Sequence, residues 1–168
     1  PSQMFNAIDS VPLTAIAFFM LTGELMTSAT ITDRLVALSR ALIGRIRGGL
    51  AQVNVLVSMF FAGMNGSVVA DTATVGALVL PAMKKAGYPA AFSAAVTGVS
   101  STIGGIIPPS IMMIVLANST EISIAALFAA GIIPGVLIGV VIMIINHYFA
   151  IKYNFERSDE PFSIRRAG

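Results

Sequence analysis

The sequence predicts an all-α polytopic membrane protein, with transmembrane helices, a re-entrant helical hairpin and a discontinuous helix. Of its 168 residues, 56% are hydrophobic and 11% are charged, whereas soluble domains have about 45–50% apolar and about 25% charged residues. Fifteen glycines and eight prolines punctuate the apolar segments, as is common in membrane-spanning helices. Two of these interruptions fall in the middle of apolar segments, where freed backbone groups require partners.

The composition also excludes several function classes. The formal net charge is only +2, which leaves no cationic surface for a phosphate backbone, so we expect no nucleic-acid partner. The absence of Cys excludes disulfides, Cys-ligated zinc and a thiol nucleophile. One His and eight acidic residues leave few ways to build a metal site, and we expect a protein that is not an enzyme. The chain starts without Met, and we expect it to be part of a longer polypeptide.

The segments before the hairpin are expected to be one span and one surface helix. Residues 1–29 hold the first transmembrane span, because the apolar run from Val11 to Ala29 has about the 20 residues that a crossing needs. Residues 30–49 have apolar residues at helical spacing with arginines beside the stripe. This pattern predicts an amphipathic arm helix in the membrane interface, which Gly48 and Gly49 are expected to end.

Residues 50–86 are predicted to form a re-entrant hairpin, which enters and leaves the membrane on the same face. The apolar run is too short for two full crossings, which need about 40 residues plus a turn. Its centre is polar, with Asn65, Gly66 and Ser67 in sequence. Irregular backbone at mid-depth is tolerated only where protein or a wet cavity surrounds it.

The remaining segments are a broken span, an intact span and a loop. Residues 87–118 form a discontinuous transmembrane helix, because Gly104–Gly105 and Pro108–Pro109 cannot be continuous helix. Residues 119–151 form a long transmembrane span, and residues 152–168 form a cytoplasmic loop.

The charged residues support an even number of crossings in the hairpin. With this topology all ten basic residues lie on one side, and the opposite side carries only Asp9 and Glu121. The basic side is cytoplasmic by the positive-inside rule. A single crossing within the hairpin segment would instead split the basic groups between two faces.

The hairpin tip and the helix break are predicted to lie near mid-depth and to form a Na⁺ site. Side-chain oxygens of Asn, Ser and Thr, with carbonyls freed by glycine, are hard ligands suited to Na⁺. Two alternatives stay open: the Ser100–Thr102 cluster hydrogen-bonds to helix carbonyls or joins helices, and the tip is only a turn. The predicted sodium ligands are Asn65, Gly66, Ser67, Ser101, Thr102 and Gly104.

An anionic substrate is predicted to approach the same region, because helix N-termini at Ser67 and Ser110 present free N–H groups and positive dipole ends. Asp71 follows one turn after Ser67, and the alternative for it is that it complements the helix dipole. The predicted substrate-binding residues are Ser67, Asp71, Ser100, Pro108, Pro109 and Ser110.

Three strings of residues, Gly63–Asp71, Pro81–Tyr88 and Ser100–Ser110, closely resemble the large membrane subunit of TRAP transporters, the tripartite ATP-independent periplasmic transporters. The resemblance covers nearly the whole chain in order and matches the first half of that subunit. It implies one half of an inverted-repeat, elevator-type transporter. Two positions depart from the family pattern, Asn65 where the family often has Ser and Gly105 where it often has Pro.

The resemblance also implies a function, which is sodium-driven uptake of an organic carboxylate in the bacterial inner membrane. The implied partners are a periplasmic substrate-binding protein and a small membrane subunit, besides the organic acid and the lipid bilayer. The alternative is a sodium–carboxylate carrier of related architecture that works without a binding protein. An intramembrane enzyme is disfavoured, because Asp71 is the only acidic residue at mid-depth and His147 lies at an interface. A structural subunit would not need paired helix breaks.

Overall fold

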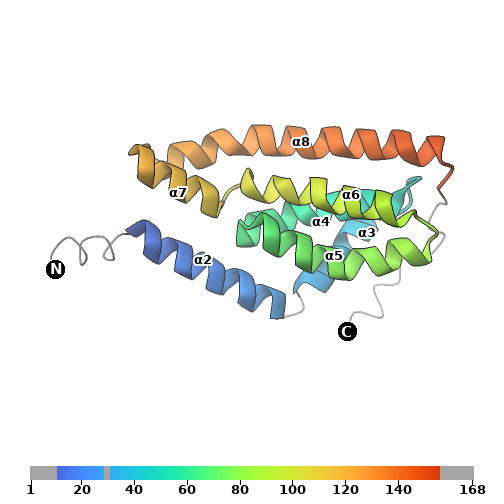
Figure 1. Ribbon diagram of the computed structural model, residues 1–168, viewed down its shortest axis with the longest axis horizontal. Coiled ribbons are helices and arrows are strands. Elements are labelled where there is room, and N and C mark those ends of the chain that lie inside the picture. The colour runs from blue at the N-terminus through green and yellow to red at the C-terminus, as the bar shows by residue number, and fades with distance from the viewer. Residues whose placement is uncertain (1–10, 29–30, 156–168) are drawn as a thin grey trace.

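The computed structural model describes residues 11–28 and 31–155, and within them every regular element is a helix. The all-helical prediction is confirmed for this part of the chain. The portions of the expected segments at residues 1–10, 29–30 and 156–168 lie outside the described residues. The elements are α2 (Val11–Ser28), α3 (Ile31–Ile43), α4 (Gly49–Asn65), α5 (Val68–Lys85), α6 (Ala90–Ser101), the 3₁₀ helix η1 (Thr102–Gly105), α7 (Ile111–Thr120) and α8 (Ile124–Lys152) (Figure 1).

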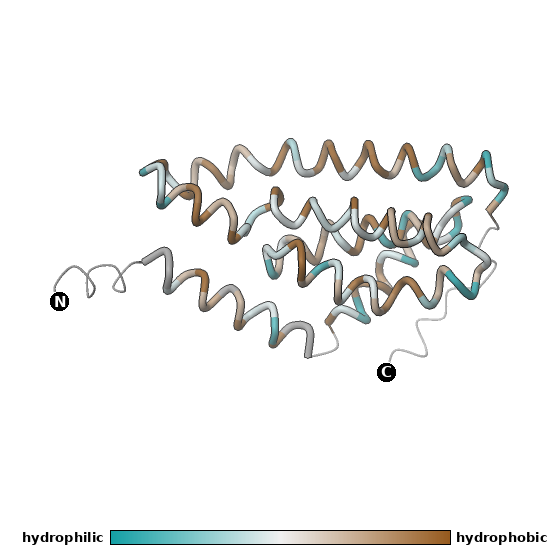
Figure 2. The backbone as a smooth tube through the Cα atoms, viewed as in Figure 1, coloured by the Kyte–Doolittle hydropathy of each residue, from teal (hydrophilic) through white to brown (hydrophobic). Residues whose placement is uncertain are grey.

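One helix in the described part of the chain, α8, is long and apolar enough to cross a membrane by length and composition. Its 29 residues extend for about 43 Å at the α-helical rise of 1.5 Å per residue. Figure 2 shows hydrophobic residues along most of α8 and hydrophilic ones toward its C-terminal end. Helices α4 and α7 are apolar but shorter.

Helix α4 lies at the centre of the fold, because it packs against α2, α3, α5, α6, α8 and η1. Its valines and one of its two phenylalanines make up much of the core, and Val53, Val57 and Phe61 are fully buried. Polar residues on α4 are buried as well, and they are Gln52, Asn54, Ser58 and Asn65. Helix α4 therefore packs directly against the first side of the helix break, at α6 and η1.

The hairpin of α4 and α5 turns within two residues at Gly66 and Ser67. Gly66 has a φ of 60°, in the left-handed region, and its N–H donates to the Ala62 carbonyl at 3.1 Å. Glycine adopts this conformation without a Cβ penalty, which ends α4. Ser67 then caps α5, because its hydroxyl accepts from the Ala70 N–H at 3.3 Å.

The break between α6 and α7 covers residues 106–110. Pro108 and Pro109 supply no N–H donors, and the chain bends after η1 to begin α7 at Ile111. The Ser110 hydroxyl joins the two sides, since it donates to the Gly105 carbonyl at 2.8 Å and accepts from the Met113 N–H at 3.4 Å. The break is therefore an ordered, capped turn.

Helix α3 ends earlier than the sequence predicts. The prediction that Gly48 and Gly49 terminate it was wrong. The helix ends at Ile43, and the Gly44 N–H closes it on the Arg40 carbonyl at 2.8 Å. Gly48 has a φ of 73° and is the N-cap of α4, and Gly49 is already inside α4. The chain reverses so tightly here that a Cβ on Gly49 would overlap the Gly44 carbonyl.

Both ends of the hairpin lie at one end of the molecule. Gly48, before α4, packs against Ala150 near the end of α8. Tyr88, after α5, contacts Phe155 just beyond α8, with ring centroids 4.5 Å apart. The turn that holds Glu121, between α7 and α8, lies at the opposite end (Figure 1). Basic residues flank the elements at the first of these ends: Arg45, Arg47, Lys84, Lys85 and Lys152.

Candidate functional site

The hairpin tip and the helix break are in direct contact. The Ile111 N–H, at the start of α7, donates to the Gly66 carbonyl at 3.3 Å. A Cβ placed on Gly66 would overlap the Pro109 carbonyl, and one on Gly104 would lie 3.7 Å from the Ser67 carbonyl. The tip therefore touches both sides of the break, which brings the N-termini of α5 and α7 together with the C-terminal end of α6 (Figure 1).

The structure brings four of the six predicted sodium ligands to this junction. Asn65 is buried, and its Oδ1 accepts from the Ser67 N–H at 3.1 Å, which closes the tip. Gly66 and Gly104 are buried beside it, and Gly104 approaches Ser67 across the gap between the elements. These four residues offer carbonyl and side-chain oxygens within one small region.

The other two predicted ligands, Ser101 and Thr102, use their hydroxyl protons within their own helix. Ser101 Oγ donates to the Thr97 carbonyl at 2.8 Å and is fully buried. Thr102 Oγ1 donates to the Val99 carbonyl at 2.7 Å and is exposed. Both hydroxyls therefore donate to helix carbonyls, as the alternative for this cluster predicted. The lone pairs of the two hydroxyl oxygens are not used in these bonds.

Four of the predicted substrate-binding residues also lie at the junction. Ser67 and Ser110 are the N-caps of α5 and α7, and Pro108 and Pro109 are half-buried in the break between them. The remaining two, Asp71 and Ser100, are fully buried in the interior. In this conformation neither of these two side chains is accessible to an incoming molecule.

A buried polar cluster next to the junction includes two residues that the sequence analysis missed, Asn54 and Ser58. Asn54 Nδ2 donates to Thr97 Oγ1 at 2.7 Å, and the Ser58 and Ser100 hydroxyls are 3.2 Å apart. The available signal was their spacing, because polar residues four apart lie on one face of a helix. Polar groups inside an apolar segment of a membrane protein often mark a functional site.

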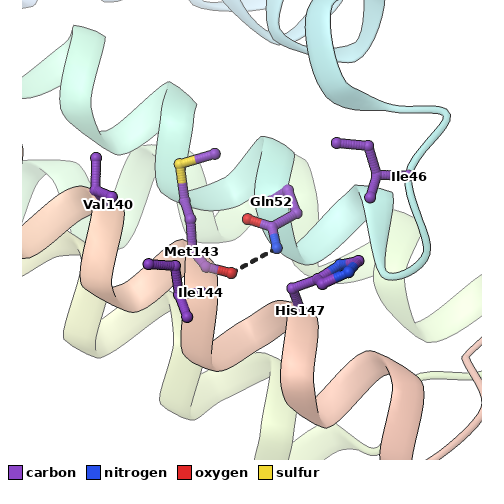
Figure 3. A pocket seen from close by; sticks show the side chains of 6 residues that line it. All are labelled: Ile46, Gln52, Val140, Met143, Ile144 and His147. Atoms are coloured by element: carbon purple, nitrogen blue, oxygen red, sulfur yellow. Dashed lines mark hydrogen bonds between the residues drawn. The ribbon is translucent and has the colours of Figure 1, made fainter.

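A separate cavity of about 370 Å³ lies at the other end of α4. Gln52 Nε2 donates to the Met143 carbonyl at 2.7 Å on one side of it (Figure 3). Since Gln52 is thirteen residues before Asn65 on the same helix, the cavity is about 20 Å from the hairpin tip. It is therefore not part of the junction. The lining residues are Ile46, Gln52, Val140, Met143, Ile144 and His147.

The oxygen ligands of the junction are uncharged. Within the described residues no group of three or more His, Cys, Asp or Glu side chains could hold a metal ion. An ion at the junction would thus be bound by hydroxyl, amide and backbone oxygens, which fit a hard monovalent cation better than a transition metal.

All 168 residues match the sequence model of the tripartite ATP-independent periplasmic transporter, DctM component. The chain belongs to this family. The family resemblance predicted from the three strings of residues is confirmed.

Relatives of the TRAP family show similar identity over most of the chain. The chain is 41% identical over 148 residues to the C4-dicarboxylate TRAP transporter large permease protein of Pseudomonas aeruginosa, covering 88% of this chain and 35% of that protein. It is 39% identical over 153 residues to the sialic acid TRAP transporter large permease protein of Vibrio cholerae, with 91% and 36% covered.

A third relative is the 2,3-diketo-L-gulonate TRAP transporter large permease protein of Escherichia coli, which is 41% identical over 157 residues, with 94% and 37% covered. The chain therefore spans just over a third of the length of these TRAP relatives. All three are named as transporter permeases, and none is named as an enzyme.

Proposed function

We propose that this chain is part of a TRAP large permease that imports an organic carboxylate, driven by a sodium gradient. The substrate is delivered by a periplasmic binding protein, and a small membrane subunit completes the transporter in the bacterial inner membrane. Family membership supports the transport class. The substrates in the relatives' names, which include a C4-dicarboxylate and a sialic acid, support the carboxylate.

The observation that carries this proposal is the contact between the hairpin tip and the helix break. The first N–H groups of a helix have no intrahelical partners, and the helix dipole makes that end positive. At the junction the N-termini of α5 and α7 lie beside carbonyls of the tip and of η1. Groups that attract an anion and groups that attract a cation are therefore adjacent, as symport requires.

The proposed sodium ligands keep the set predicted from the sequence. Asn65, Gly66, Ser67 and Gly104 lie at the contact itself. Ser101 and Thr102 border it, and their lone pairs remain for a cation because their protons are bonded elsewhere. The donor set of uncharged oxygens fits Na⁺, which would hold the tip against the break.

The proposed substrate site lies on the outward side of the same contact, at Ser67, Pro108, Pro109 and Ser110. The basic residues described for the hairpin, Lys84 and Lys85, are at the other end of α5. Within this chain the carboxylate would therefore be met by backbone N–H groups, by hydroxyls and by the nearby cation. Asp71 and Ser100 are buried, so they would not touch the substrate. They would affect substrate binding only by positioning the hairpin tip.

The proposal includes a topology and a motion. The α4–α5 hairpin is re-entrant from the cytoplasmic face, and the chain supplies one half of an inverted repeat. Helix α3 is the interfacial arm between a scaffold and a mobile part, because its arginines Arg34 and Arg40 are exposed beside an apolar side. Elevator movement would carry the tip and the break together across the membrane.

Uptake by the complete transporter in proteoliposomes tests this function. We expect substrate accumulation only with an inward sodium gradient and the binding protein present. Asn65→Ala should raise the sodium concentration for half-maximal uptake, whereas Ser119→Ala, at an exposed hydroxyl near the end of α7, should leave it unchanged. Accumulation without sodium, or without the binding protein, would refute the proposal.

A further inference from the structure

Asp71 is a buried carboxylate that nothing in the described structure neutralises. It lies in the first turn of α5 with an exposed fraction of 0%, and neither Oδ1 nor Oδ2 has a hydrogen-bond partner. The basic residues of the same helix, Lys84 and Lys85, are at its far end. A buried charge without a partner is strongly unfavourable, so this position needs either a proton or a bound cation.

The groups that face this carboxylate are the hydroxyls of Ser101 on α6 and Ser58 on α4. Each hydroxyl has one proton. Ser101 Oγ donates to the Thr97 carbonyl at 2.8 Å, and Ser100 Oγ is within donating distance of the same carbonyl, at 3.1 Å, and of Asn54 Oδ1, at 3.5 Å. The Ser58 and Ser100 hydroxyls lie 3.2 Å apart, and either of them can be the donor. The carboxylate therefore faces neutral hydroxyls, which can solvate its charge but do not balance it.

The side-chain amide of Asn54, which borders these serines, also hydrogen-bonds within the cluster. Asn54 Nδ2 donates to Thr97 Oγ1 at 2.7 Å, and Asn54 Oδ1 is 3.5 Å from the Ser100 hydroxyl. The arrangement thus places a negative charge beside neutral hydroxyl oxygens, with the basic residues of α5 at the far end of that helix. Such a set is complementary to a cation, and its hard oxygen atoms suit Na⁺ rather than a softer metal.

We propose that Asp71, Ser58 and Ser101 form a second Na⁺ site, behind the hairpin tip and joining α5 to α4 and α6, which shares Ser101 with the proposed tip site. Asp71 is four residues after Ser67, which places it about 6 Å further along the helix axis. The site adds a charged ligand that the tip does not have, and it extends the proposed sodium coupling. An ion here holds the base of the tip, so its binding favours the closed contact with the break.

The experiment measures equilibrium binding of radioactive Na⁺ alone, without substrate, to the purified full-length transporter in lipid nanodiscs. Asp71→Asn keeps the size of the side chain and removes its charge. We expect this variant to bind one Na⁺ fewer per protein, and Ser58→Ala to weaken the binding of that ion. Ser93→Ala is the matched control for Ser58→Ala, because Ser93 is likewise a buried serine, on α6, but bonds the Pro89 carbonyl at 3.1 Å. This control variant should bind sodium as the wild type does.

The tip variant Asn65→Ala separates this site from the proposed tip site. Loss of one ion in Asp71→Asn, with Asn65→Ala unchanged, would support the second site and refute the tip site. Full sodium stoichiometry and affinity in Asp71→Asn would overturn the inference. Thermal unfolding in sodium-free buffer is the check on folding: we expect Asp71→Asn to be at least as stable as the wild type there, and to gain less from added Na⁺.

Discussion

Replacing Gly66 by Ala tests whether the tip–break contact organises the site. Gly66 has a φ of 60°, where an L side chain costs about 1–2 kcal/mol. The added Cβ would overlap the Pro109 carbonyl and lie 3.0 Å from Ser110 Cα and 3.1 Å from the Ile111 nitrogen. All three neighbours are backbone, so no rotamer change relieves the overlap.

The tip must therefore move away, and the bond from the Ile111 N–H to the Gly66 carbonyl is lost, which costs about 1 kcal/mol. The strain is present whether or not the tip touches the break, so only the lost bond and the overlap act on the contact, and the bond alone is a factor of about 5 in its equilibrium. Because the apparent affinity falls with the population of the competent state, we expect half-saturating Na⁺ for uptake to rise about fivefold or more.

Gly87→Ala is the matched control. Gly87 also has a positive φ, 79°, but a Cβ there meets nothing within 4 Å. It should show a similar backbone strain in thermal unfolding and an unchanged sodium dependence. Equal sodium dependence in the Gly66 and Gly87 variants would refute the argument that the contact with the break, rather than strain alone, creates the site.

Three further experiments probe the fold and the topology around the junction. Ser110→Ala removes the cap of α7 and its bond to the Gly105 carbonyl, so we expect a loss of about 0.5–2 kcal/mol in unfolding free energy, measured in detergent; an unchanged midpoint would contradict the capping role. Cysteines introduced at the exposed positions 47 and 86 should both react with an impermeant thiol reagent from the cytoplasmic side, and labelling from opposite sides would disprove the re-entrant hairpin. Gly135→Val would push α8 off the Ile107 side chain in the break, costing about 1–3 kcal/mol by overpacking, whereas Val136→Ala, at an exposed position, should cost much less in the same melt.

The positions of the two helix interruptions could be predicted from the sequence, because their causes are local. Proline lacks an N–H wherever it stands, and a Gly beside Asn and Ser favours a turn in any context. The chain accordingly ends α4 at Asn65 and resumes helix at Ile111 after the second proline. The family resemblance depended on the same punctuated strings, since they are the distinctive part of an otherwise uniformly apolar sequence.

The end of α3 shows where local reasoning stops. Three glycines, Gly44, Gly48 and Gly49, are each compatible with a helix end. The structure uses Gly44 for the end of α3 and Gly48 to begin α4. That choice depends on how closely Gly48 packs against Ala150, which is about a hundred residues away in the sequence.

The sequence by itself determined the helical class, the family and the two interruptions, since composition, proline chemistry and motif order act over a few neighbouring residues. Only the tertiary structure decided what surrounds Asp71. The side chains of Ser58 and Ser101 come from two other helices, and the direction of their hydroxyl protons depends on carbonyls that packing places nearby. A hydroxyl can donate or accept with equal ease, so its role is decided by the three-dimensional arrangement of its partners.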